Sequence, residues 1–331
     1  SVVAAAMGQV VPEMSVGDLK GGANHIHIAG PRNDGSTYIH YEWPAGGTGA
    51  SVGVDGSNAV RSYNEGDFNS IQSVETVESQ YPLRVERCEI RAGACGDGES
   101  RGGFGLRRDI RILGETAMLS VLSEKNVIPP YGVKKGSNGA ANRFVVLRDG
   151  KEVPPSDVPG KVSGFPLRTG DVVREETAGG GGHGNPLGRD QEKVKEDVRL
   201  GYISIDQAAS RYGVVIGEDG EVNADQTAER RKNLEDRRVY VELEVANEDD
   251  INGPSRYISI PSPLAKKLNI TEGDLIEIHA KAAAPLRGWA KISKATKSII
   301  SVGPVGIKLL NAKPGEMAEI RPVSSAPVGI L

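Results

Sequence analysis

Length, composition and charge set the first limits on this chain. It has 331 residues, of which 25% are charged and 38% are hydrophobic, so it is long enough for two domains with a sizeable core. Its formal net charge of −4 gives no broad positive field for nucleic acid or an anionic membrane surface. No apolar run approaches the roughly 18 residues that span a bilayer, and no basic-then-apolar leader is present. We therefore expect a cytoplasmic protein without nucleic-acid or membrane partners.

The first two thirds of the chain predict sheet structure. Ser1–Met7 has the pattern of an amphipathic helix that begins without an initiator Met, so we expect the chain to be part of something larger. Period-two patterns separated by glycine-rich turns predict antiparallel strands at 25–30, 37–42, 83–91 and 108–113. The alternating charges of Leu83–Ile90 are typical of a strand with one solvent-exposed face.

Side chains of these strands offer two weak candidate sites. His25 and His27 lie two apart, as do His40 and Glu42, a pattern that either holds a divalent metal or marks the wet face of a sheet. The wet face is the favoured interpretation. Cys88 and Cys95 have six residues between them, which is neither a zinc knuckle nor a redox dithiol, so we expect ordinary thiols.

Glycine-rich segments are the most informative feature. Gly46–Gly49 resembles a phosphate-binding loop only superficially, because no Lys-Ser/Thr pair follows it. Gly102–Gly105 predicts a hairpin, with Arg101, Arg107, Arg108 and Asp109 as charges at its rim. The run Gly179–Gly182 requires positive φ, close backbone approach or disorder, because glycine loses the most conformational freedom on folding. The rigid Asn185-Pro186 step that follows it favours a shaped backbone over disorder.

The remaining pattern predicts a hairpin, short helices and a barrel. Asp149-Gly150 predicts a tight turn, and Ser204–Gln207 is a capping box for a helix that ends at Gly213. The segment 257–278 recurs 42 residues later at 299–320, which predicts a pseudo-twofold β-barrel of the double-psi or swapped-hairpin kind. Glu277 and Glu319 hold equivalent positions in this repeat and are expected to face solvent. The fold class is therefore mainly β with short helices (α+β): a glycine- and proline-rich antiparallel sheet domain and a small C-terminal pseudo-twofold β-barrel.

Several motifs occur in a fixed order along residues 1–230. They are Tyr41-Glu42, Gly46–Ala50 with Asp55-Gly56, Glu75 and Glu78 before Tyr81–Glu86, Arg101–Gly105 through Arg108, Pro129–Gly132, and Gly179–Asp190 with two helices ending at Tyr212–Val215. Together they resemble the hydantoinase B family, which includes the second half of 5-oxoprolinases and the homologous subunits of acetone and acetophenone carboxylases. The resemblance identifies 1–216 as the C-terminal half of such a domain, followed by a linker at 217–236 and the duplicated barrel at 237–325.

Three departures from the family pattern matter. His183 stands where the family usually has an aromatic residue, and the usual Asn-Thr-Pro is not kept cleanly around Asn69-Ser70. The N-terminal half of the family, with its His and Asp motifs, is absent. No metal ligand is therefore assigned to this chain, and a divalent metal (Zn or Mn) is expected in the missing half.

The resemblance implies a division of labour. A partner subunit of the actin-like ATPase (hydantoinase A) class, using ATP and Mg²⁺, phosphorylates a carbonyl-derived oxygen, and the hydantoinase B part hosts attack on the activated carbon. The leading hypothesis is a subunit or fragment of an ATP-dependent cyclic-amide hydrolase that acts on a small molecule and is inactive alone. A ketone carboxylase subunit and a non-catalytic scaffold are the alternatives. The candidate catalytic residues are His183, Asp109 and Arg107, and the candidate substrate-loop residues are Gly179, Gly180, Gly181, Gly182, Gly184, Gly102, Gly103 and Gly105.

Overall fold

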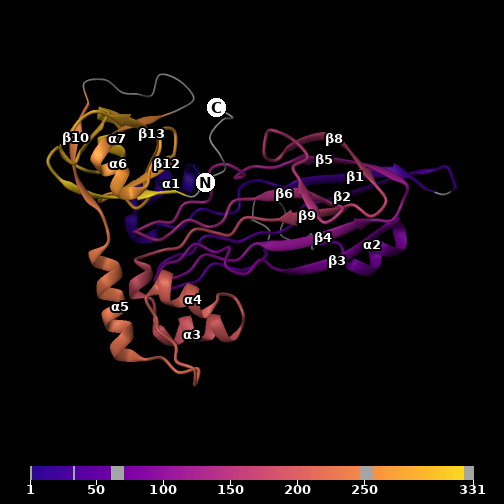
Figure 1. Cartoon of the computed structure of the whole chain (residues 1–331), viewed down its shortest axis with the longest axis horizontal. Helices are drawn as coiled ribbons and strands as arrows, with labels where there is room; N and C mark the ends of the chain where they lie inside the picture. Colours follow the sequence, from indigo (N-terminus) through magenta and orange to yellow (C-terminus); the bar gives the residue numbers. More distant parts are fainter. Residues whose placement is uncertain (1, 33, 61–70, 247–255, 324–331) are drawn as a thin grey trace.

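The structure is a computed structural model that describes residues 2–32, 34–60, 71–246 and 256–323. The Asn69-Ser70 departure lies outside these residues. Three parts follow one another along the long axis of the molecule (Figure 1): a two-sheet sandwich, a bundle of extended segments, and a β-barrel at the opposite end.

The sandwich consists of two antiparallel sheets packed face to face. The first has the order β2-β1-β5-β8, with β1 at His25–Pro31, β2 at Thr37–Glu42, β5 at Thr116–Leu122 and β8 at Lys161–Arg168. The second has the order β3-β4-β9-β6-β7, with β3 at Leu83–Ile90, β4 at Leu106–Ile112, β9 at Val172–Glu176, β6 at Arg143–Arg148 and β7 at Lys151–Val153. Alternate residues of both sheets, such as Ile28, Leu119, Ile110 and Val173, form the shared core. The predicted antiparallel strands are confirmed.

Two predicted turns have different outcomes. Asp149 and Gly150 both have positive φ, 53° and 76°, and join β6 to β7, so the predicted hairpin is confirmed. The hairpin predicted at Gly102–Gly105 is wrong. β3 and β4 do pair, but residues 91–105 between them run out of the sheet into the bundle and return. A sequence window cannot distinguish this excursion from a tight turn, because both are rich in glycine.

The helices outside the barrel are short; most lie beside the bundle, and α2 (Val74–Gln80) packs next to β3 of the sandwich (Figure 1). They are α1 (Val2–Val10), α2 (Val74–Gln80), α3 (Gln191–Arg199), α4 (Ile205–Gln207), α5 (Ala224–Asp236), the 3₁₀ turns Pro12–Met14 and Pro186–Gly188, and a π turn at Ala208–Tyr212. The predicted capping box of Ser204 and Gln207 is present, and the chain leaves this helix at Gly213 with φ 66°. Among the described residues, none of the helices combines the length and hydropathy that a transmembrane span requires. Helix α5 occupies most of the expected linker, and the boundaries at 216 and 237 stay predictions.

The C-terminal part is a closed six-stranded barrel with the order β10-β14-β11-β13-β12-β15. Its elements are β10 (Tyr240–Val245), β11 (Tyr257–Pro261), α6 (Ser262–Leu268), β12 (Leu275–His279), β13 (Leu286–Ser293), β14 (Ile299–Val302), α7 (Pro304–Leu309) and β15 (Met317–Pro322). The pairing is pseudo-twofold: β10 pairs with β14 in parallel and with β15 in antiparallel, just as β13 pairs with β11 and β12. The predicted duplicated barrel is confirmed.

Candidate functional site

The glycine run lies within the bundle between the sandwich and the barrel. Each residue from Gly179 to His183 donates its backbone N–H to a different carbonyl, and residues three apart bond to the same neighbouring segment. The acceptors, in order, are Ala140, Gly103, Asp18, Ser137 and Ser100, at 2.8–3.2 Å. Three residues per turn without internal hydrogen bonds is the geometry of a polyproline II helix. The run is therefore one strand of a bundle of extended, glycine-rich helices.

Close approach of neighbouring backbones explains why the run is glycine. A Cβ on Gly180 would lie 1.8 Å from the carbonyl oxygen of Thr48, and one on Gly181 would lie 1.8 Å from that of Tyr131. A Cβ added to Gly102, Gly103 or Gly105 would likewise lie 1.9–2.0 Å from a carbonyl oxygen of a neighbouring segment. Among Gly179–Gly184, only Gly184 has positive φ, at 79°. The substrate-loop role of these glycines stays a prediction.

His183 follows the glycines at the end of the bundle. Its backbone pairs with Ser100 in both directions, at 2.9 and 3.1 Å, and its Nε2 lies 3.5 Å from Ser15 Oγ. The side chain is buried, and this burial lowers the pKa of His183; Glu99 partly offsets the effect and Lys134 reinforces it. The imidazole is therefore neutral at pH 7 and has one nitrogen that can accept a proton.

A buried ion network fixes the chain on the far side of His183. Arg189 donates to both carboxylate oxygens of Asp55, at 2.7 and 2.8 Å, and to Asp197 of helix α3, at 2.9 Å. Arg101 reaches Asp197 at 3.0 Å through Nε and Asp55 at 2.8 Å through its backbone N–H. Burial alone would raise the pKa of Asp55, but the hydrogen bond and charge of Arg189 outweigh it and lower this pKa. The charges of Asp55 and Asp197 are thus balanced by those of Arg101 and Arg189.

The barrel places a second set of charges against the bundle. Glu277 and Glu319 were expected to face solvent, but each is only 2% exposed, and His279 between them is 5% exposed. His279 of β12 lies opposite Glu319 in the antiparallel register of β12 and β15, and its side-chain Nε2 lies 3.2 Å from Glu277 Oε2. Burial alone would raise the pKa of Glu277, but Arg287 and His279 lower it to about 2. The expectation failed because this face of the barrel is covered by the bundle.

Three barrel-side arginines join these acids to the loops around His183. Arg287 donates to Glu277 at 2.7 Å, to the carbonyl oxygen of Pro129 at 2.5 Å and to the side chain of Asn138 at 2.7 Å. Arg321 pairs with Glu319 and donates to the carbonyl oxygen of Lys135 at 3.0 Å. Arg238, which precedes β10, joins Glu319 to Asn185, two residues beyond His183. The end of the bundle is therefore held between the barrel and the Asp55–Arg189 network.

The other two predicted catalytic residues lie elsewhere. Arg107 and Asp109 lie on β4, where Asp109 pairs with Arg107 at 2.8 Å and with Arg174 of β9 at 3.0 Å. The first pair lies within β4 and the second joins β4 to β9, and both lie on the outer face of the sandwich. Within the described residues, neither side chain has a hydrogen bond or ion pair with His183. Their catalytic role stays a prediction that this geometry does not favour.

The histidine pairs of the first sheet do not form one site either. His25 and His27 point outward, whereas His40 and Glu42 are buried on the opposite face of the same sheet. The wet-face interpretation therefore fits the first pair and is wrong for the second. Across the described ranges, no group of three or more His, Cys, Asp or Glu is placed to hold a metal ion. Cys88 is an exposed free thiol and Cys95 a buried one.

A buried polar cluster between the two sheets was not predicted. Arg108 donates to Glu42 at 2.9 Å, His40 lies 3.6 Å from the same carboxylate, and Glu175 of β9 is fully buried beside them. Burial raises the pKa of Glu175 well above its usual range, and the charge of Glu42 adds to this effect. Tyr41-Glu42 and Arg108 both lie in motifs quoted above, but nothing in the sequence linked them to each other or to Glu175.

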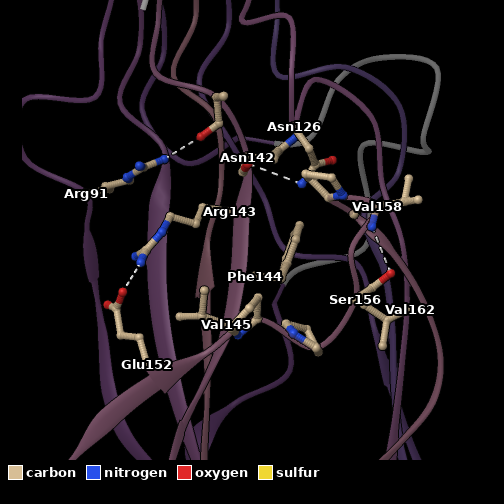
Figure 2. Close-up of a pocket in the computed structure, with 15 residues that line it drawn as sticks. Arg91, Asn126, Asn142, Arg143, Phe144, Val145, Glu152, Ser156, Val158 and Val162 are labelled. Atoms are coloured by element: carbon tan, nitrogen blue, oxygen red, sulfur yellow. Dashed lines mark hydrogen bonds and ion pairs between the residues drawn. The ribbon is translucent and has the colours of Figure 1, made fainter. Parts of the chain in front are cut away.

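One cavity lies at the open edge of the sandwich. It has a volume of about 570 Å³ and is lined by β6, β8 and the proline-rich loop between β7 and β8. Figure 2 shows its polar side chains engaged with the protein: Arg91 with the carbonyl oxygen of Ala141, Arg143 with Glu152, and Asn126 with the main chain of Asn142. The lining includes none of the predicted site residues, so this cavity is separate from the end of the bundle.

Comparison with known proteins places most of the chain in one group. The family model described as Hydantoinase B/oxoprolinase matches residues 1–186. The beta chain of the caprolactamase from Pseudomonas jessenii is 31% identical over 238 residues, which are 68% of this chain and 40% of that protein. A Pseudomonas sp. (strain NS671) protein that carries the name of a D-/L-hydantoinase component is 31% identical over 228 residues, 69% of this chain and 37% of that protein. The chain spans about two fifths of the length of these relatives.

Solved structures agree with the family match. The ATP-dependent caprolactamase from Pseudomonas jessenii superposes with a TM-score of 0.57 at 26% identity, over 69% of this chain and 40% of that chain. Nucleotide-free acetone carboxylase superposes with a TM-score of 0.53 at 21% identity, over 66% of this chain and 34% of that chain. At this lower identity, the likeness to acetone carboxylase shows the fold alone.

Proposed function

The chain belongs to the hydantoinase B/oxoprolinase family, and from this premise we propose that it is a subunit or fragment of an ATP-dependent cyclic-amide hydrolase. One observation carries the choice of substrate class. The two relatives that are 31% identical carry the names of a hydantoinase and a caprolactamase, and hydantoin and caprolactam are both cyclic amides. The likeness to a ketone carboxylase rests on 21% identity, so carboxylation is the second candidate.

The chemistry of a cyclic amide explains why such an enzyme uses ATP. The amide carbon is a poor electrophile, because the nitrogen lone pair is delocalised onto the oxygen. Phosphorylation of that oxygen makes the carbon more electrophilic, so that water can add to it. The adduct then breaks the ring C–N bond: the nitrogen takes a proton and leaves as an amine, and an acyl phosphate remains. A second water hydrolyses the acyl phosphate to the carboxylate and inorganic phosphate. We assign the phosphorylation, with its ATP and Mg²⁺, to a partner subunit of the actin-like ATPase class. This chain contributes to the site where the activated carbon is attacked.

The described residues do not supply a ligand set for a divalent metal. We therefore assign the Zn or Mn site to a polypeptide that carries the N-terminal half of a hydantoinase B domain. No step that we assign to the residues of this chain involves a metal.

His183 is the residue that we propose acts in this step. Its imidazole is neutral and lies 3.5 Å from Ser15 Oγ, and pairing with Ser100 fixes its backbone at the end of the bundle that the barrel covers. A neutral imidazole in this position can accept the proton of the attacking water. The acids and arginines of the neighbouring Asp55–Arg189 network are paired with one another, and we assign the change of protonation state in this step to His183.

Product analysis tests the proposed reaction. We expect the chain, purified together with its partner polypeptides, to open 5-oxoproline, hydantoin or caprolactam in an ATP-dependent manner without incorporating labelled bicarbonate. Mass spectrometry of the product distinguishes the two reactions. Incorporation of the label into a ketone substrate would establish the carboxylase alternative instead.

Replacement of His183 by phenylalanine tests its role. We expect His183→Phe to lower kcat by about 100-fold, the lower end of what a positioned acid–base group contributes, with assembly and thermal midpoint unchanged. The wild-type rate should also fall at low pH, through a pKa that lies below the usual 6.5 for histidine. Unchanged turnover in an intact complex would support the scaffold alternative, because the aromatic ring restores the family pattern while removing the proton acceptor.

A further inference from the structure

The two outer faces of the sandwich have opposite chemical character. Ion pairs run across the outer face of the β3-β4-β9-β6-β7 sheet: Arg111 with Glu86 at 2.5 Å, Arg174 with Asp109 at 3.0 Å, and Arg143 with Glu176 at 2.7 Å. Such a face satisfies its own charges and remains solvated.

The outer face of the other sheet carries no formal charge over three of its strands. Strands β2 and β5 alternate along their whole length and β1 alternates over residues 25–29, with the inward residues buried. The outward residues, which we call the uncharged face, are His25, His27, Ala29, Thr37, Ile39, Tyr41, Thr116, Met118, Ser120 and Leu122. None of the ten is Asp, Glu, Lys or Arg. Protein interfaces show this composition, because charged residues are depleted and aromatic residues and Met are enriched at their cores.

Large apolar side chains on this face are open to solvent in the chain alone. Ile39 is 64% exposed, Met118 55% and Leu122 54%. The strand register places Ile39 and Met118 on either side of Ala29, so they form one continuous patch. A solvated strand face of a self-sufficient sheet carries polar or charged residues at such positions.

Aromatic side chains order one corner of the uncharged face. The ring of His27 stacks on Tyr41 with centroids 4.2 Å apart, and His25 Nδ1 lies 2.5 Å from the Tyr41 hydroxyl. Trp43, just beyond β2, contacts the same hydroxyl. Burial, reinforced by His25, lowers the pKa of His27, so its imidazole is neutral at pH 7. These contacts hold the side chains of the corner in place in the chain alone, and such pre-organisation reduces the conformational entropy lost on association.

We propose that the uncharged face is the docking surface for the polypeptide that carries the remaining part of the family's length. In the two relatives of this chain that are 31% identical to it, the matched region makes up only 37–40% of one continuous protein. The larger, unmatched part of each relative therefore belongs to the same molecule as the matched region. The inner faces of the sandwich are filled by each other, and the opposite outer face is covered by ion pairs. The uncharged face is the surface of the sandwich whose composition suits a permanent, apolar contact. The occupant is the partner already assigned in the proposed function, and the inference rests on it.

A charge-insertion experiment on the native complex tests the proposal. The double variant Ile39→Glu/Met118→Glu places two carboxylates on the uncharged face, and both positions are exposed in the chain alone, so its fold should be unaffected. Leu200→Glu, at the C-terminal end of helix α3 and 46% exposed, is the matched control. We expect the double variant to weaken binding of the partner polypeptide about 100-fold or more, and the control to bind as wild type, because burying unpaired charges is costly.

Oxidative footprinting gives an independent measurement. We expect Met118, Tyr41 and Trp43 to be protected in the complex relative to the separated chain, while Met317 of the barrel, which is 60% exposed, reacts equally in both. Equal reactivity of Met118 in the two states, normal binding of the double variant, or a homodimer formed through this face would each overturn the proposal. These results are separate from the cyclic-amide assay: a complex that binds through this face and does not hydrolyse cyclic amides refutes the proposed reaction alone.

Discussion

Gly180→Ala should lower the free energy of unfolding by about 3 kcal/mol or more, which is the upper end of what overpacking costs in protein cores. The added Cβ would lie 1.8 Å from the carbonyl oxygen of Thr48 and within 2.8 Å of the backbone nitrogen of Gly49. No rotamer change relieves a clash with backbone. Separation of the two segments would break the bonds from Gly180 N to Gly103 O and from Gly103 N to Thr48 O, both 2.9 Å.

The matched control for this substitution is Gly114→Ala. A Cβ on Gly114 would lie 3.5 Å from the side chain of Pro82 and 3.9 Å from the carbonyl oxygen of Thr116, both ordinary van der Waals contacts. Chemical denaturation of both variants should place Gly114→Ala within about 1 kcal/mol of wild type. Equal unfolding midpoints for the two variants would show that the bundle tolerates a side chain at Gly180, and the close-packing explanation of the glycine run would then be wrong.

The glycine run also shows how far the sequence could predict this region. Close backbone approach was one of three explanations for Gly179–Gly182, and it is the one that the structure supports. The neighbours themselves could not be predicted. Asp18, Gly103 and Ser137 come from three distant parts of the chain, and a polyproline II helix has no internal hydrogen bonds that would give it a local sequence signature.

The barrel illustrates the opposite case. The 42-residue repeat predicted two equivalent halves, and the strand pairing shows them. The exposure of Glu277 and Glu319 was predicted wrongly, because a repeat specifies what faces the barrel interior and says nothing about what packs on its outside. Arg238, Arg287 and Arg321 were the available signal, since buried acids need cationic partners, but only the folded chain pairs them.

Those pairs should also dominate the stability of the barrel's contact with the bundle. Arg287→Met removes the cation beside Glu277 and the bonds to Pro129 and Asn138, while the aliphatic part of the side chain is kept. Breaking a buried pair leaves an uncompensated charge, so we expect a loss of about 3–5 kcal/mol at pH 7. Arg84→Met is the control. Arg84 pairs with Glu86 at 3.1 Å on an exposed surface, and its removal should cost less than about 1 kcal/mol.

The pH dependence of this loss identifies Glu277 as its origin. In the wild type, the pKa of Glu277 is about 2 when folded, against 4.5 in its unperturbed state, so its contribution is present above pH 4.5 and is lost as the pH falls towards 2. In Arg287→Met, burial is no longer offset by the guanidinium, so the folded pKa moves upward and the folded state accepts a proton more readily. Because the unfolded states of the two proteins titrate alike, the difference in their unfolding free energies should be larger at pH 7 than at low pH. It should shrink as the pH falls through the raised folded pKa of the variant towards 2. A difference that stays constant between pH 7 and pH 3 would assign the loss to the hydrogen bonds with Pro129 and Asn138 instead of to the buried carboxylate.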